Sequence, residues 1–216
     1  MAKIGTPNIY GFELKKIEHT RGMEGYGLCG EMYLNGKKIG TYEDYGDGGM
    51  GNERYDTKED RIAMTHLIFK YGDKYPSQFM LDLFEKEPNR IEEEKERIRK
   101  YQPFITEEEM TLNALSNNDL DTLVYHWEQL NEEKKAFNRA IKKGYAGIAT
   151  CKGDDESRVD NEVTYLIPKR ILDDINSGKT TEFDGKKIVR VISSLEDLNI
   201  KDEPSKEKEK EGEIER

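Results

Sequence analysis

Ten of the nineteen glycines of this chain lie between Gly22 and Gly51, with tyrosines between them and acidic residues near the end of the segment. Glycine adopts backbone conformations that are closed to other residues, and it lets another group approach the main chain closely. A segment this rich in glycine is typical of a twisted sheet with tight turns or of a recognition surface, and one segment can be both. It is therefore the part of the chain where we look first for function.

This segment belongs to a first region, residues 1–56, for which we expect an antiparallel sheet of three strands. Apolar residues predict these strands over residues 9–17, 26–34 and 37–45. Asn35-Gly36 predicts a tight hairpin between the second and third strands, because both residues accept positive φ. Residues 46–56 are expected to form a loop.

Residues 57–143 predict a helical middle region, because apolar residues recur there at intervals of three and four. Thr106 and Glu109 have the spacing of a capping box at a helix start. The longest helix is expected over 119–143, with Trp127 in its apolar stripe. The other expected helices cover residues 57–71, 76–84 and 106–115, and the highly charged stretch 90–100 is a solvated helix or a connector.

The third region, residues 144–200, predicts a small α/β element. Its strands are expected at 145–150, 163–167 and 188–192, with a helix at 169–176, a hairpin turn at Asp184-Gly185 and a helical turn at 194–200. Residues 201–216 contain too few apolar residues to fold alone, and we expect a disordered tail of mixed charge. The fold class is therefore expected to be α+β.

The net charge of −10 limits the classes of partner. Binding to phosphate backbones depends on clustered Lys and Arg, whereas acidic residues exceed basic ones in all four regions of this chain. We therefore expect no direct binding to nucleic acid or to membranes, whereas the negative charge permits docking on a basic protein surface. Cys29 and Cys151 are far apart and predict free thiols, as expected for a cytoplasmic protein.

No motif for catalysis, cofactor binding or a metal stands out. The three histidines, His19, His66 and His126, have no metal-ligand spacing. We expect His19 in a solvated hairpin turn, and His66 and His126 as satisfied residues at the core or its boundary. A metal-dependent nuclease or hydrolase is the enzymatic alternative, and its candidate ligands are the acids Asp154, Asp155, Glu156, Asp160 and Glu162.

The run from Ile9 to Gly51 contains I-Y-G-F-E-L, E-G-Y-G, L-N-G-K-K-I-G and D-Y-G-D-G-G. In these phrases it resembles the start of orphan proteins carried by phages and mobile elements of Gram-positive bacteria, over about a fifth of the chain. Small acidic orphans of this kind include anti-defence inhibitors such as anti-CRISPR proteins. The strand order also resembles a double-stranded RNA-binding domain, but the acids in the corresponding loop argue against RNA binding.

Tyrosine and glycine together provide rigid anchors and close approach, a composition found in binding surfaces. We therefore expect a non-enzymatic protein that docks on a host protein with a basic surface, inhibits a nucleic-acid-dependent defence effector, and needs no cofactor. The expected contact residues are Tyr42, Asp44, Tyr45, Asp47, Glu53 and Tyr55. An oligomeric structural phage protein, built on the helix that contains Trp127, is the third alternative.

Overall fold

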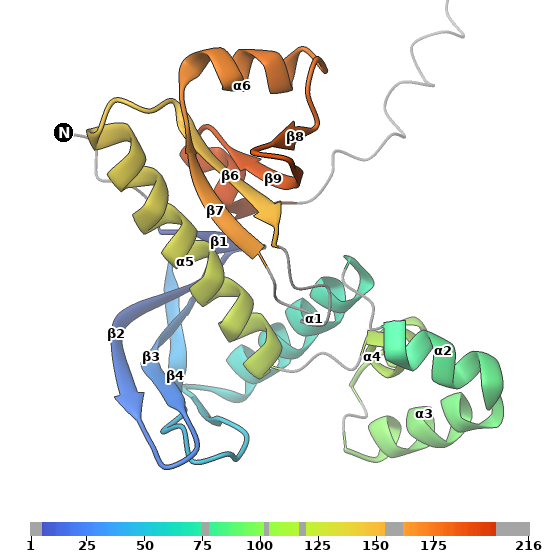
Figure 1. Cartoon of the computed structure of the whole chain (residues 1–216). Coiled ribbons are helices and arrows are strands. Elements are labelled where there is room, and N and C mark those ends of the chain that lie inside the picture. Colours follow the sequence, from blue (N-terminus) through green and yellow to red (C-terminus); the bar gives the residue numbers. More distant parts are fainter. Residues whose placement is uncertain (1–5, 75–77, 102–103, 117–119, 154–161, 202–216) are drawn as a thin grey trace, which may run out of the picture.

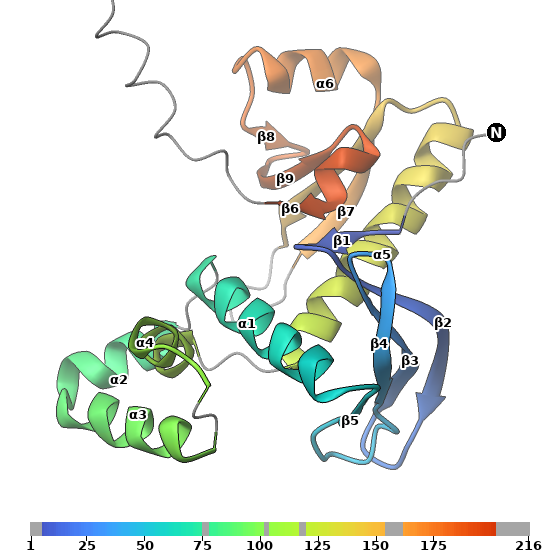
Figure 2. The ribbon, with the colours of Figure 1, turned by 180° about the vertical axis from the view of Figure 1, so that it is seen from behind.

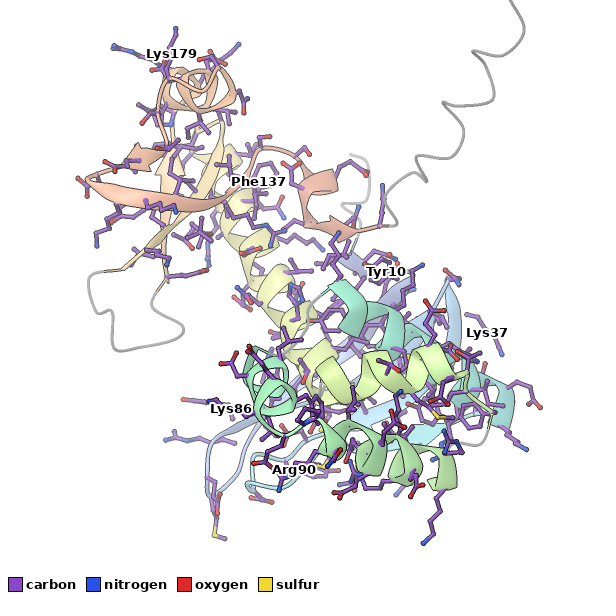
Figure 3. All side chains as sticks on the ribbon, turned by 90° about the vertical axis from the view of Figure 1, so that its right-hand side faces the viewer. Tyr10, Lys37, Lys86, Arg90, Phe137 and Lys179 are labelled. Carbon is purple, nitrogen blue, oxygen red and sulfur yellow. The ribbon has the colours of Figure 1, made fainter. Side chains whose placement is uncertain are left out.

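The computed structural model describes residues 6–74, 78–101, 104–116, 120–153 and 162–201. It is a mixed α+β structure with two sheets. Helix α5 (Leu120–Lys142) runs from the N-terminal sheet past the C-terminal sheet, and helices α2 to α4 form a separate group beside α1 (Figure 1). Figure 3 shows the labelled side chain of Phe137 where α5 passes the C-terminal sheet.

The N-terminal sheet has six strands in the order β10-β1-β2-β3-β4-β5. Its strands are β1 (Asn8–Ile9), β2 (Phe12–Arg21), β3 (Tyr26–Leu34), β4 (Lys37–Glu43), β5 (Asn52–Tyr55) and β10 (Asn199–Ile200). The hairpin at Asn35-Gly36 is confirmed, with positive φ at both residues. All neighbouring strands are antiparallel except β1 and β10, which pair in parallel.

The prediction of a three-stranded sheet is wrong. The first expected strand is broken at Tyr10 and Gly11, which both have positive φ, so that β1 and β2 are separate strands. Strand β5 lies within the segment that we expected to be a loop. Strand β10 comes from the far end of the described chain and is only two residues long. Such short strands carry no alternation that a sequence pattern could reveal.

The helical middle is confirmed in its main features. The helices there are α1 (Lys58–Lys74), α2 (Gln78–Lys86), α3 (Asn89–Tyr101), α4 (Glu107–Ser116) and α5. The capping box at the start of α4 is present, because the Glu109 amide donates to the Thr106 hydroxyl and the Thr106 amide donates to the Glu109 carboxylate. Phe69, Phe84, Ile98, Ile105, Met110 and Ala114 form a small apolar cluster of this region.

The C-terminal sheet has the order β7-β6-β9-β8 and is antiparallel throughout. Its strands are β6 (Gly147–Lys152), β7 (Glu162–Ile167), β8 (Glu182–Phe183) and β9 (Lys186–Ile192), and helix α6 (Lys169–Asn176) has the predicted bounds. One face carries Ala149, Cys151 and Ile167, which pack against α6. The opposite face carries Ile148 and Ile192, which join the same core cluster as Phe137 of α5.

One large core connects the two sheets. It contains Ile9 of β1, Met64 of α1, Trp127 of α5 and Ile148 of β6. The 3-10 helix η1 (Leu195–Leu198) adds Leu198 and leads into β10, where the chain returns to the N-terminal sheet (Figure 2). Residues from three of the regions expected from the sequence therefore share one core. All but the first residue of the expected tail lie outside the described residues.

Glu31 of β3 lies between two lysines of the neighbouring strands. Lys16 and Lys38 both place their ammonium nitrogens 3.0 Å from the Glu31 carboxylate. Hydrogen bonds from these lysines lower the pKa of Glu31 to about 2. Because this pKa is lower in the folded than in the unfolded chain, the resulting stabilisation is present above pH 4.5 and is lost as the pH falls towards 2.

We therefore expect the Glu31 carboxyl to titrate near pH 2 in a carbon-detected NMR titration. Replacing Lys16 or Lys38 by glutamine should raise this pKa towards its ordinary value, and the double replacement should raise it furthest. Added salt should act in the same direction, because solvent and ions screen this partly exposed pair of contacts. A Glu31 pKa near 4.5 in the unaltered protein would contradict the contacts of both lysines with this carboxylate.

Candidate functional site

Two loops at one end of the N-terminal sheet are tied together by hydrogen bonds. The turn between β2 and β3 lies beside the loop between β4 and β5 (Figures 1 and 2). The Met23 amide donates to the Asp47 carboxylate over 3.1 Å, and the Glu24 amide donates to the Gly46 carbonyl over 3.0 Å. The two loops therefore present one joint surface.

The glycines of this segment permit close contacts between the loops and the sheet. A Cβ atom on Gly27 would lie 2.1 Å from the carbonyl oxygen of Asp44, and one on Gly51 would lie 2.4 Å from the ring of Tyr42. Gly46 has a φ of +74°, a conformation that disfavours side chains. At these positions the glycines allow the loop to pack closely on the sheet and on Tyr42.

Two aspartates fasten the loop between β4 and β5 to helix α5. The Asp44 carboxylate accepts hydrogen bonds from the Gly46 amide (2.8 Å) and from the Tyr125 hydroxyl (2.5 Å). The Asp121 carboxylate accepts from the Tyr42 hydroxyl (2.8 Å) and from the Gly51 amide (3.1 Å). The bond to Asp44 raises the pKa of Tyr125 to about 12, and burial together with Asp121 raises the pKa of Tyr42.

This arrangement corrects the expected set of contact residues. Tyr42 and Asp44 are both buried, Tyr42 almost completely, so they support the loops from inside and offer no side-chain surface to a partner. The Tyr55 ring is half-buried, and its hydroxyl donates to Glu53 over 3.1 Å on the edge strand β5. Tyr45 and Asp47 lie on the loop surface.

The exposed apolar side chains at this end of the sheet include Met23 and Met50, which the sequence analysis did not predict, and Tyr26, the first residue of β3. Met23 is 96% exposed, Tyr26 and Met50 are each 74% exposed, and Tyr45 is 50% exposed. The available signal was a methionine within each glycine-rich turn, where no strand or helix periodicity accounts for an apolar residue. We call the surface formed by Met23, Glu24, Tyr26, Tyr45, Asp47 and Met50 the loop platform.

A second feature is a polar cavity of about 1020 Å³ between α5 and the C-terminal sheet. Helix α5 contributes a stripe with the three- and four-residue spacing of one helix face, at Thr122, His126, Gln129, Glu133 and Ala136. The sheet contributes Thr150, Glu162 and Thr164, and α1 contributes Tyr71. An adjoining hollow of about 450 Å³ shares His126, Gln129, Glu133 and Glu162, and it adds Arg190 of β9.

Three polar side chains at this cavity and the adjoining hollow, His126, Glu133 and Arg190, are paired. The His126 Nδ1 atom lies 2.7 Å from the Tyr71 hydroxyl, and burial, with a smaller effect of Arg190, lowers the pKa of His126. Arg190 donates to the Glu133 carboxylate over 2.9 Å and to the Asp197 carbonyl over 2.6 Å. Burial raises the pKa of Glu133, although Arg190 acts in the opposite direction. Perturbed groups that line a cavity mark a candidate site.

The remaining candidate residues have structural contacts. His66 lies 2.5 Å from Glu109, and His19 lies in β2, 3.0 Å from Glu128, so its expected place in a hairpin turn is wrong. Cys29 and Cys151 are free thiols, as predicted.

Within the described part of the chain, no group of three or more His, Cys, Asp or Glu side chains is placed to hold a metal ion. The acids Asp154, Asp155, Glu156 and Asp160 lie outside it, whereas Glu162 begins β7 and lines the cavity. Of the helices in the described ranges, none has the length and apolar character of a membrane span. Comparisons with protein-family models, with curated protein sequences and with solved structures find no match for this chain.

Proposed function

We propose that this protein acts by binding another protein, and that the loop platform docks on a basic surface of its partner. The observation that carries the proposal is the exposure of Met23, Tyr45 and Met50 on two loops that hydrogen bonds hold together, with Tyr26 exposed at the adjoining start of β3. Large apolar side chains exposed close together are typical of interaction sites on soluble proteins. Methionine adapts its shape to a partner, and tyrosine supplies rigid contact area.

The charge of the platform supports a basic partner. The exposed acids of the platform are Glu24 and Asp47, and the loops 22–25 and 44–51 have no Lys or Arg, although Arg21 of β2 lies 5.6 Å from the centre of the Tyr26 ring. The chain as a whole has a net charge of −10, which favours association with positively charged surfaces. Enzymes that act on nucleic acids offer such surfaces, because they bind phosphate groups.

The specific form of the proposal is a phage-type inhibitor of a host nucleic-acid-dependent defence protein. It rests on the resemblance of residues 9–51 to orphan proteins of phages and mobile elements, together with the acidic platform. An inhibitor of this kind needs no catalytic residues, since it acts by covering the surface where its target binds nucleic acid. The contact residues that we propose are those of the loop platform.

The test is capture of the partner from a nuclease-treated host extract, identification by mass spectrometry, and titration of the purified partner. Replacing both Tyr45 and Met50 by serine should raise the dissociation constant at least about ten-fold, because exposed aromatic and methionine anchors carry much of the energy of an interface. Added salt should weaken the complex, because part of the attraction is between opposite charges.

The matched control is Ile141→Ser, which removes a side chain that is 46% exposed on α5, outside the platform. It should leave the dissociation constant unchanged. An equal rise of the dissociation constant in the double variant and in Ile141→Ser would contradict the proposal. So would a partner that binds the double variant as tightly as the unaltered protein. Light scattering tests the oligomeric alternative. If the unaltered protein self-associates and the double replacement converts it to a monomer, the loop platform forms contacts between copies of this chain.

A further inference from the structure

We propose that the polar cavity between α5 and the C-terminal sheet is a binding site for a small, uncharged, polyhydroxylated ligand. This inference is independent of the loop platform and goes beyond partner binding. The cavity has a volume of about 1020 Å³, and its walls come from α1, α5, β6 and β7. Small-molecule sites are clefts or cavities of about 300–1,000 Å³ in which a few polar groups fix the orientation of the ligand.

The strongest single indication is the hydroxyl group of Thr150. Thr150 is 4% exposed and lines the cavity, and its Oγ1 atom has no hydrogen-bond partner within the described part of the chain. A buried hydroxyl without a partner costs free energy, so such groups in folded proteins are nearly always paired. A ligand hydroxyl in the cavity would supply the missing partner.

The register of the sheet places further polar residues beside Thr150. Thr150 is directly opposite Thr164 of β7 and Arg190 of β9, and opposite residues of neighbouring strands share one face of a sheet. This face is turned towards the stripe of α5 that contains His126, Gln129 and Glu133. Polar groups from a helix and from three strands therefore converge on one space.

The charge balance of the inner wall favours an uncharged ligand. Arg190 and Glu133 neutralise each other over 2.9 Å, and burial, with a smaller effect of the nearby guanidinium group, lowers the pKa of His126, which favours its neutral form. Glu132, Glu162 and Arg139 lie in the exposed part of the lining. On the rim, the Glu132 carboxylate is paired with Lys135 over 2.5 Å. Glu162 and Arg139 have opposite charges, so neither charge sign predominates in the lining.

The chemical type of the lining groups points to hydroxyl groups on the ligand. Thr150 and Thr164 offer hydroxyls, and Gln129 offers an amide. Each of these groups can both donate and accept a hydrogen bond, as a ligand hydroxyl can. Tyr125 also lines the cavity, and its aromatic ring can cover the C–H face of a sugar. A free sugar and the ribose of a nucleoside share this chemistry.

The experiment is an amide NMR titration of the full chain with D-glucose, D-ribose and uridine, each to tens of millimolar. We expect at least one of them to shift amide signals of α5 from His126 to Glu133 together with those of Thr150 and Thr164. Tighter binding of glucose or ribose than of uridine would identify a free sugar as the ligand type, and the reverse order would identify a nucleoside. Inorganic phosphate and spermidine, as anionic and cationic probes, should leave these signals unchanged.

Thr150→Val tests the hydroxyl directly, because it keeps the shape of the side chain. It should weaken binding of the active probe at least about ten-fold while raising the melting temperature, since an unpaired buried hydroxyl is removed. Thr150→Ser keeps the hydroxyl, and its dissociation constant should stay within about three-fold of that of the unaltered protein.

If Thr150→Val does not fold, Gln129→Ala, on the exposed part of the lining, should weaken binding at unchanged stability. The proposal is overturned if none of the three polyols shifts these signals, if phosphate or spermidine binds there instead, or if both Thr150→Val and Gln129→Ala bind normally.

Discussion

Replacing Trp127 by alanine is expected to lower the free energy of unfolding by about 3–5 kcal/mol. The Trp127 ring is fully buried in the core that connects both sheets. Its indole nitrogen donates to the carbonyl oxygen of Pro7 over 2.8 Å, which fixes the segment before β1 against α5. The replacement therefore opens a large cavity and leaves the buried Pro7 residue without this donor. Urea denaturation measures the effect.

Two control variants separate the loss of ring packing from the loss of the hydrogen bond and from a general effect of changing α5. Trp127→Phe keeps most of the ring and loses the hydrogen bond, and we expect a loss of about 1–3 kcal/mol. Ile141→Ala removes a half-exposed side chain of the same helix and should change stability by less than about 0.5 kcal/mol. A loss of under about 1 kcal/mol for Trp127→Ala would show that α5 does not hold the two sheets together.

The second large effect is expected for Gly27→Ala. A methyl group at this position would lie 2.1 Å from the carbonyl oxygen of Asp44 and 2.5 Å from the hydroxyl oxygen of Thr20. These two groups are joined by a hydrogen bond of 2.9 Å that crosses the glycine. The backbone carbonyl cannot rotate away as a flexible side chain could, so the loop must move. We expect a loss of stability of about 1–3 kcal/mol or more.

Gly25→Ala is the matched control, because nothing lies within 4 Å of a Cβ atom at that position and its φ is not positive. Its effect on stability should stay below about 0.5 kcal/mol. If the loop platform binds a partner, Gly27→Ala should also weaken that binding, since the loop that carries Tyr45 and Met50 is displaced. Equal stability of the two alanine variants, measured by denaturation, would contradict the close approach of Asp44 to β3.

The sequence predicted those elements whose determinants are local. The period of apolar residues predicted α5 to within about a residue at each end, and Asn35-Gly36 and Asp184-Gly185 predicted turns whose residues all have positive φ. The capping box of Thr106 and Glu109 was likewise found from spacing alone. In each case a few neighbouring residues set the backbone conformation, so distant parts of the chain have little influence.

The candidate site was predicted only in part, because burial depends on what folds over a residue. Asp47 was correctly expected on a glycine-rich loop, whereas Tyr45 was expected at the end of a strand and lies beyond the end of β4. The same pattern gave no sign that Asp121 and Tyr125 would bury Tyr42 and Asp44. The two residues that do this lie far along the chain on another element. Met23 and Met50 were not predicted as exposed contacts, because an apolar residue in a turn follows no period that shows which way its side chain faces.

By itself the sequence determined a mixed α+β chain, its longest helix, its tight turns and its acidic character, since propensity, periodicity and charge are properties of short stretches of chain. Only the tertiary structure decided that β10 pairs with β1, that one core joins both sheets, and that Thr150, His126 and Arg190 line a cavity and the hollow that adjoins it. These outcomes depend on which distant segments meet, because strand pairing and burial are contacts between surfaces that no local pattern encodes.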